Sequence, residues 1–294
     1  MGRNQIIQSR YGRMLVNDGD AVIGRSIAYY GEYFESEVEV FRHFLAPGSV
    51  AVDAGANIGT HALALAHLVG PSGRVLAFEP QRALFQMLCA SMALNDIGWA
   101  DCHWTALTAE PCVLHLSELD LSRPGNHGGV ALVETETEDG RPVAGVPLDD
   151  VFAEDRLDLI KVDVEGMEIA VLLGAEGVIR RFLPVLYVEN DRLDRSSTLI
   201  ELLAGWGYGC HWHLAPFHNP GNANGRTEPL HPCGFTDQGD RLGSIGFAVN
   251  MLCMPPGRPA PEGRELVPVA TATEHPYRRD CIARFGPMVE ALRR

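Results

Sequence analysis

The sequence lacks any cysteine arrangement that would cross-link the fold through disulfides or a bound metal. Its seven cysteines are odd in number and form no C-x-x-C pair, so we expect neither a zinc ribbon nor a disulfide framework. It also lacks an apolar run near the ~20 residues that a bilayer-spanning helix requires. Residues 1–30 have the character of neither a signal peptide nor a transit sequence. We therefore expect a cytoplasmic protein that does not enter a membrane.

Positive charge is scarce. Lys and Arg number 24 against 38 Asp and Glu, which gives a formal net charge of −14, and no basic stripe offsets this excess. A chain of this sign repels phosphate backbones, so we expect no nucleic-acid partner. The expected partner is a neutral or cationic small molecule. The pattern leaves the oligomeric state open, including a homo-oligomer.

Apolar, β-branched segments alternate with helical patterns from about residue 49 to residue 250. This alternation predicts an α/β fold with a doubly wound, mostly parallel, seven-stranded sheet and helices on both faces. We expect a closing antiparallel pair at 209–214 and 244–251. The other strands are expected at 49–54, 74–79, 103–107, 158–164 and 184–189.

Interruptions of this alternation predict the domain organisation. Residues 1–30 are interpreted as an N-terminal extension, 31–254 as the main domain, and 255–294 as a Pro-rich segment with a C-terminal helix. Within the main domain, residues 117–147 are expected to be an insertion. The unusually long stretch 216–243 is expected to be a lid, a binding loop or disorder.

The segment from Val52 to Thr60, VDAGANIGT, predicts a ligand site. A strand that runs into a glycine-containing turn and then a helix presents backbone N–H groups to a ligand at the sheet edge. The spacing is G-x-x-x-G with Asn57 in place of the central glycine of a dinucleotide fingerprint, which argues against a pyrophosphate. Glu79 ends the next strand, where a carboxylate can accept both hydrogen bonds of a ribose diol.

Three segments, VDAGANIG, AFEP at 77–80 and KVDVEGME at 161–168, together resemble the FkbM family of methyltransferases. The resemblance covers about residues 30–191, with the motifs in the family's order. It implies a class I, Rossmann-like methyltransferase domain with S-adenosylmethionine as donor, and usually O-methylation of a small-molecule or sugar hydroxyl.

The resemblance also implies a set of cofactor contacts. Glu79 would hold the ribose, and Ala106 and Leu107 would flank the adenine. Glu37, in the acidic segment GEYFESE, would reach the amino group of the cofactor. The methionine end would be lined by Asp53, Gly55, Asn57 and Gly59.

Methyl transfer to a hydroxyl needs an acceptor oxygen held near the sulfonium carbon and one general base. Asp163, at the end of the fourth strand and next to the expected sulfonium, is the favoured base, although an ion pair with Lys161 is an alternative role. Glu189, at the end of the fifth strand, and His213 are further candidates. Asp163 and Glu189 also resemble, by position alone, the layout of metal-dependent O-methyltransferases, but a divalent metal is the less favoured interpretation.

Other functions stay open on sequence grounds. An NAD-dependent oxidoreductase shares the strand, turn and helix pattern, although the missing glycine weighs against it. A non-catalytic cofactor-binding subunit would carry the same motifs. N-methylation of a small amine needs the same transfer geometry.

Overall fold

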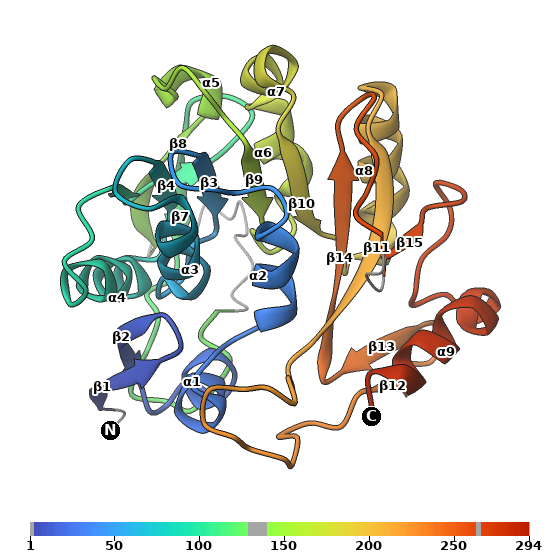
Figure 1. The fold of residues 1–294 in the computed structure, drawn as a ribbon, viewed down its shortest axis with the longest axis horizontal. Helices are drawn as coiled ribbons and strands as arrows, with labels where there is room; N and C mark the ends of the chain where they lie inside the picture. The colour runs from blue at the N-terminus through green and yellow to red at the C-terminus, as the bar shows by residue number, and fades with distance from the viewer. Residues whose placement is uncertain (1–2, 129–139, 263–265, 294) are drawn as a thin grey trace.

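The computed structural model describes residues 3–128, 140–262 and 266–293, and its centre is an eight-stranded sheet (Figure 1). Five adjacent strands are parallel, and the three strands at one edge join them through antiparallel pairs. The strands, in spatial order, are β15 (Leu266–Pro268), β11 (Gly209–Pro216), β14 (Phe247–Met254), β10 (Val185–Glu189), β9 (Leu159–Val162), β3 (Val50–Ala54), β4 (Arg74–Phe78) and β5 (Ala100–His103).

Helices cover both faces of this sheet, because its central strands are apolar on both sides. In β3, Val50, Val52 and Ala54 pack into one hydrophobic cluster and Ala51 into the other. The first cluster includes residues of α6 (Glu168–Leu173), α7 (Glu176–Phe182), α8 (Leu193–Gly205) and α9 (Ile282–Ala291). The second includes residues of α2 (Glu35–Phe41), α3 (Thr60–Val69) and α4 (Arg82–Ala93). The expected doubly wound, mostly parallel sheet is confirmed.

Two details of the sheet differ from the sequence prediction. An eighth strand is present because β15, in the tail, pairs with β11 at the edge. The strand expected at 103–107 divides: β5 joins the main sheet, whereas β6 (Ala106–Leu107) joins a separate three-stranded sheet with β7 (Cys112–Leu116) and β8 (Arg141–Val146). The expected closing pair is confirmed as β11 and β14.

The segments outside the sheet pack against it. The hairpin of β1 (Asn4–Ser9) and β2 (Gly12–Asn17) is followed by α1 (Ile23–Tyr30), and Met14, Val16 and Ile27 are buried in the second cluster. The region 117–147, expected to be an insertion, contains the segment that follows β7 and the strand β8. Its residues 129–139 lie outside the described residues. The predicted division into an extension, a domain and a tail stays a prediction.

The long stretch after β11 is a loop followed by a hairpin of β12 (Gly234–Asp237) and β13 (Leu242–Ile245). The loop runs past α1 at the bottom of the view before it returns to β12 (Figure 1). Short helical turns complete the chain at α5 (Leu148–Val151) and η1 (Arg279–Cys281). Within the described ranges, no helix combines the length and the apolar character that crossing a membrane demands.

The strand order places a switch point at the centre of the sheet. The chain leaves β3 toward β4 and β5 on one side, and returns to β9 and β10 on the other. Connections that diverge in this way open a crevice at the carboxyl ends of the strands, where open α/β sheets bind ligands.

Candidate active site

A cavity of about 370 Å³ lies at the carboxyl ends of the central strands. It is the crevice that the switch point predicts. The structure brings six of the residues singled out from the sequence to its wall, namely Glu37, Gly55, Asn57, Glu79, Asp163 and Glu189.

The turn after β3 gives the cavity a wall of backbone. Gly55 has a φ of 84°, and a Cβ at this position would lie 1.8 Å from the carbonyl oxygen of Asp163, so only glycine fits. Gly59 does not line the cavity; a Cβ there would lie 2.9 Å from Leu88. The absence of a side chain at Gly59 therefore allows α3 to pack closely on α4. The geometry favours this packing role over the predicted contact with the ligand.

Glu79 is held in a fixed orientation at the end of β4. One carboxylate oxygen accepts from the backbone N–H of Asn57 at 2.9 Å and the other from that of Gln81 at 2.7 Å. Only 4% of the residue is exposed. Burial raises the pKa of Glu79 to about 7, against the opposing effect of the two backbone hydrogen bonds. A buried, oriented carboxylate of this kind suits a ligand that donates hydrogen bonds to it.

Asp53 is fully buried and is not among the residues that line the cavity, which differs from the role predicted for it. Its carboxylate is fully buried, 3.7 Å from the Nζ of Lys161. The same Nζ lies 3.1 Å from Asp163, so the ion-pair alternative for Lys161 is what the structure contains. Burial alone would lower the pKa of Lys161, but the surrounding carboxylates of Asp163, Asp53 and Glu37 raise it overall. Lys161 is the only lysine in the chain.

Three carboxylates converge beside this lysine. Asp163, Glu165 and Glu189 each offer an oxygen within 4.8 Å of the others. Burial raises the pKa of Glu189 well above its ordinary value, and the negative charges of Asp163 and Asp191 add to the effect. One oxygen of Glu189 is buried without a hydrogen-bond partner among the described residues. A proton, an ammonium group or a hard cation would each relieve this concentration of negative charge.

Glu37 and His61 form a second polar pair on the cavity wall. Glu37 accepts from the side-chain amide of Asn250 at 2.9 Å, and its other oxygen lies 3.2 Å from the Nε2 of His61. Both residues are at most 4% exposed. Glu37 was predicted for the site from the sequence, whereas His61 was not.

Besides Asp53 and Gly59, three residues predicted for the site do not line the cavity. His213 is buried and shares a 2.6 Å hydrogen bond between its Nδ1 and the hydroxyl of Tyr187, so it packs within the sheet instead of facing an acceptor. Ala106 and Leu107 are buried in β6, which belongs to the small sheet. The division of the expected third strand moves them away from the ligand crevice.

Aromatic side chains that the sequence analysis missed line another part of the cavity. They are Tyr33 and Phe34, between α1 and α2, and Phe217, at the start of the long loop. The rings of Phe34 and Phe217 are stacked with centroids 4.3 Å apart, and those of Tyr33 and Phe217 are 5.8 Å apart. The adjacent Tyr33 and Phe34 just before the acidic helix were a usable signal, whereas nothing near Phe217 indicates its partner.

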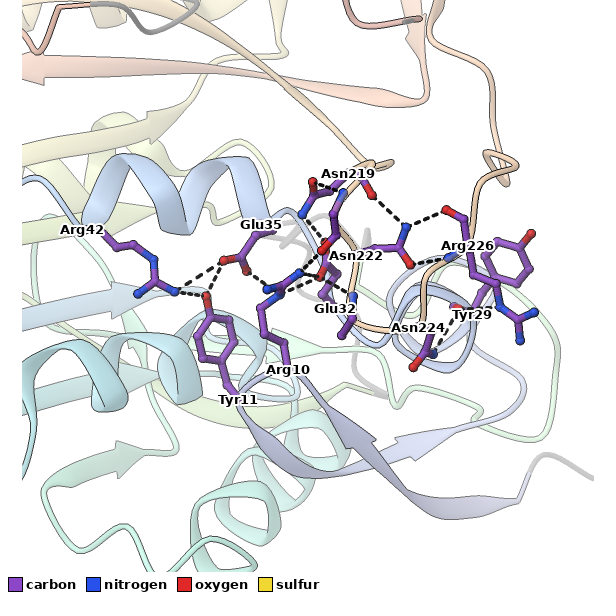
Figure 2. A network of polar contacts seen from close by, with 12 residues as sticks. Arg10, Tyr11, Tyr29, Glu32, Glu35, Arg42, Asn219, Asn222, Asn224 and Arg226 are labelled. Carbon is purple, nitrogen blue, oxygen red and sulfur yellow. Dashed lines mark hydrogen bonds and ion pairs between the residues drawn. The ribbon is translucent and has the colours of Figure 1, made fainter.

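The asparagine-rich part of the long loop is tied to the N-terminal segment (Figure 2). Asn219 donates to Glu32, and Asn224 donates to the carbonyl of Tyr29. The side chain of Asn222 bonds within the loop, to the carbonyls of Asn219 and Arg226. These amides therefore hold the loop in place.

Comparison with known proteins identifies relatives of this chain. Residues 53–209 match the family model described as the methyltransferase FkbM domain. The chain is similar to methyltransferase sdnD of Sordaria araneosa, at 29% identity over 164 residues, which cover 42% of this chain and 60% of that protein. It is also similar to methyltransferase 1 of Beauveria bassiana (strain ARSEF 2860), at 31% identity over 148 residues, 44% of this chain and 59% of that protein. The matches thus span about 60% of the length of these relatives.

Solved structures also resemble the chain. A methyltransferase FkbM from Methylobacillus flagellatus KT matches with a TM-score of 0.43 and 18% identity, over 74% of this chain and 50% of that one. An S-adenosylmethionine-dependent O-methyltransferase from Thermotoga maritima matches with a TM-score of 0.46 and 11% identity, over 87% of this chain and 78% of that one.

Proposed function

Because the chain belongs to the FkbM methyltransferase family, we propose that it transfers the methyl group of S-adenosylmethionine to a hydroxyl of a small-molecule or carbohydrate-like acceptor. The observation that carries this proposal is the pairing of Glu79 with the close-approach turn at Gly55. The two stand on one cavity at the switch point of the sheet. This is the arrangement that an adenosyl ligand requires.

The described residues fit the cofactor. Glu79 is oriented by two backbone N–H groups and has lone pairs left to accept from a ribose diol. The turn from Gly55 to Asn57 allows backbone contact with the methionine portion, and Glu37 supplies a buried carboxylate for its ammonium group. The acid-rich wall favours a ligand that carries positive charge on both its amino and sulfonium groups. When bound, the cofactor supplies the electrophilic methyl group.

Glu189 is the general base in this proposal. Asp163 is already paired with the ammonium of Lys161, whereas Glu189 has a buried oxygen without a hydrogen-bond partner among the described residues. Burial raises the pKa of Glu189, which makes its carboxylate a stronger proton acceptor than an ordinary glutamate. Asp163 then orients the acceptor hydroxyl. His213, which bonds Tyr187 away from the cavity, takes no part.

Calorimetry with S-adenosylhomocysteine and with NAD tests the cofactor, and a methyl-transfer assay on a pool of hydroxyl compounds tests the reaction. We expect binding of S-adenosylhomocysteine, none of NAD, and transfer from labelled S-adenosylmethionine. Binding of NAD alone would favour an oxidoreductase. Binding of S-adenosylhomocysteine without any transfer would favour a non-catalytic subunit.

An amine is the second candidate acceptor, because the cavity wall carries an excess of acid. Among its described residues, the lysine is the only Lys or Arg, against six carboxylates: Glu37, Glu79, Asp163, Glu165, Glu189 and Asp191. Such a wall attracts cations and would hold an ammonium before its deprotonation. Matched pairs of an amine and an alcohol on the same carbon skeleton separate the two reactions.

Transfer in this proposal does not depend on a metal. Lys161 already places a positive charge beside Asp163, where a divalent cation would otherwise act. The oxygens of Asp163, Glu165 and Glu189 are nevertheless spaced to hold one. We expect EDTA to leave the transfer rate unchanged. A rate that EDTA abolishes and Mg²⁺ restores would assign these carboxylates to a metal.

A further inference from the structure

One side of the cavity is an aromatic wall formed by Tyr33, Phe34 and Phe217. The rings of Phe34 and Phe217 are nearly parallel, with an interplanar angle of 29°, and Tyr33 is tilted against Phe217 at 59°. The wall stands near the proposed base. Burial raises the pKa of Tyr33, and the charges of Asp163, Glu37 and Glu189 raise it further.

The wall is assembled from two distant parts of the chain. Figure 2 shows Glu32, next to Tyr33 in the sequence, in contact with the long loop. This residue is only 3% exposed. One of its oxygens accepts from the side-chain amide of Asn219 at 2.9 Å, and the other accepts from the backbone N–H of Ala223 at 3.0 Å. Arg10, at the turn of the N-terminal hairpin, donates to the same carboxylate at 2.7 Å and also to the carbonyl of Gly221. The buried carboxylate of Glu32 therefore contacts the loop that carries Phe217 at two points, Asn219 and Ala223.

The neighbouring residues show that the loop is closely seated. Tyr30 accepts from the backbone N–H of Asn224 at its carbonyl and from that of Leu230 at its hydroxyl, at 3.0 and 2.6 Å. Gly31 has a φ of 75°, and a Cβ there would lie 3.0 Å from the Cβ of Ala223. Close backbone approach and buried hydrogen bonds leave the loop little freedom to shift.

We propose that Tyr33, Phe34 and Phe217 form the acceptor subsite, which receives the flat apolar face of a ring-bearing acceptor, and that Glu32 is the residue that positions it. This inference rests on the proposed function. Aromatic faces bind planar or apolar ring faces through offset stacking at centroid distances of about 4.5–7 Å. Glu32 does not touch the acceptor; it acts by holding Phe217 against Phe34.

The charge of Glu32 is the feature to remove. In Glu32→Gln the side chain keeps its shape, but it has one acceptor oxygen in place of two, and its new NH₂ group faces another donor. At least one of the contacts to Arg10, Asn219 and Ala223 is then lost. Glu35→Gln is the matched control, because Glu35 is similarly buried and contacts Tyr11, Arg42 and Arg10 without touching the loop.

The experiment measures three quantities in both variants and in the wild type. They are the affinity for S-adenosylhomocysteine, the affinity of that complex for 2-naphthol with glycerol as the ring-free comparison, and hydrogen exchange in peptides covering 217–230. We expect 2-naphthol, and not glycerol, to bind the wild-type complex. Glu32→Gln should weaken 2-naphthol about fivefold and speed amide exchange in the loop, without changing the affinity for S-adenosylhomocysteine. Glu35→Gln should change neither the affinity for 2-naphthol nor the amide exchange of the loop.

Two further variants keep the outcome decisive. Phe217→Ala should weaken the binding of 2-naphthol to a similar degree while amide exchange at Ala223 stays slow. This variant distinguishes the contribution of the Phe217 ring from that of the contacts that hold the loop. If Glu32→Gln does not fold, Asn219→Ala removes one of the same contacts from the loop side. Loss of 2-naphthol binding in either case supports the proposal.

Several results would overturn it. They are absence of 2-naphthol binding to the wild-type complex, equal binding of glycerol, or equal behaviour of Glu32→Gln and Glu35→Gln. Failure of the wild-type protein to bind S-adenosylhomocysteine would instead overturn the proposed function. The exchange comparison would still report whether Glu32 holds the loop.

Discussion

The affinity for S-adenosylhomocysteine is predicted to fall in acid because of Glu79. This carboxyl is buried, and burial raises its pKa to about 7 in the free protein. Only the ionised carboxylate can accept from both hydroxyls of a ribose diol, so binding favours release of the proton wherever the free protein holds one. Compared with the ordinary glutamate value of 4.5, a pKa of about 7 corresponds to about 3 kcal/mol in favour of the neutral carboxyl.

The expected size follows from this linkage. If the bound diol returns the pKa of Glu79 to near its ordinary value, the dissociation constant rises about tenfold between pH 8 and pH 6, and about sevenfold more by pH 5. The folding stability of the free protein depends on pH in the opposite direction from the affinity. An acid whose folded pKa is raised binds more protons when folded, so its stability contribution is present below about pH 4.5 and is lost as the pH rises through about 7.

Isothermal calorimetry with S-adenosylhomocysteine from pH 5 to pH 8 measures the effect directly. Glu79→Gln is the control, since an amide can still accept one hydrogen bond but does not titrate. Its affinity should be lower at pH 8 and nearly flat below it. A wild-type affinity that is constant over this range, or an equal slope in Glu79→Gln, would refute the reasoning.

Three further substitutions probe the rest of the site. Gly55→Ala should cost several kcal/mol of stability, because its Cβ would overlap the carbonyl of Asp163; urea unfolding measures this, and a near-neutral result contradicts the turn geometry. Glu189→Gln should lower kcat about 10²- to 10⁴-fold with S-adenosylhomocysteine affinity unchanged, and an unaltered kcat removes it as base. Lys161→Met should destabilise the fold by about 3–5 kcal/mol, because Asp53 stays buried without its cation; an unchanged melting temperature would show that the pair contributes little.

The donor side of the site could be predicted because its signals are local. A strand, a glycine turn and a later strand-ending acid lie within about thirty residues. Gly55, Asn57 and Glu79 line the cavity, and their contacts with a cofactor stay a prediction. Asp53 was misplaced because β3 is buried on both faces. The alternation of side chains then does not tell which of two adjacent end residues faces the crevice.

The proposed acceptor side could not be predicted because its contacts are long-range. Glu32 and Asn219 are 187 positions apart, and no periodicity or motif links them. His213 was misjudged for a similar reason, since its partner Tyr187 lies on a strand that is not adjacent to its own in the sheet. Hydrogen bonds of this kind depend on tertiary packing, which sequence patterns report only weakly.

The seating of the long loop on the N-terminal segment affects how such proteins could be re-engineered. The family match begins at residue 53 and ends at residue 209, so Tyr33, Phe34 and Phe217 all fall outside it. The proposed acceptor wall therefore lies outside the family match, whereas Gly55, Asn57 and Glu79 lie within it. A chimera would need to exchange residues 29–34 and 217–230 as one cassette, because either half alone would meet a foreign partner across the Glu32 junction.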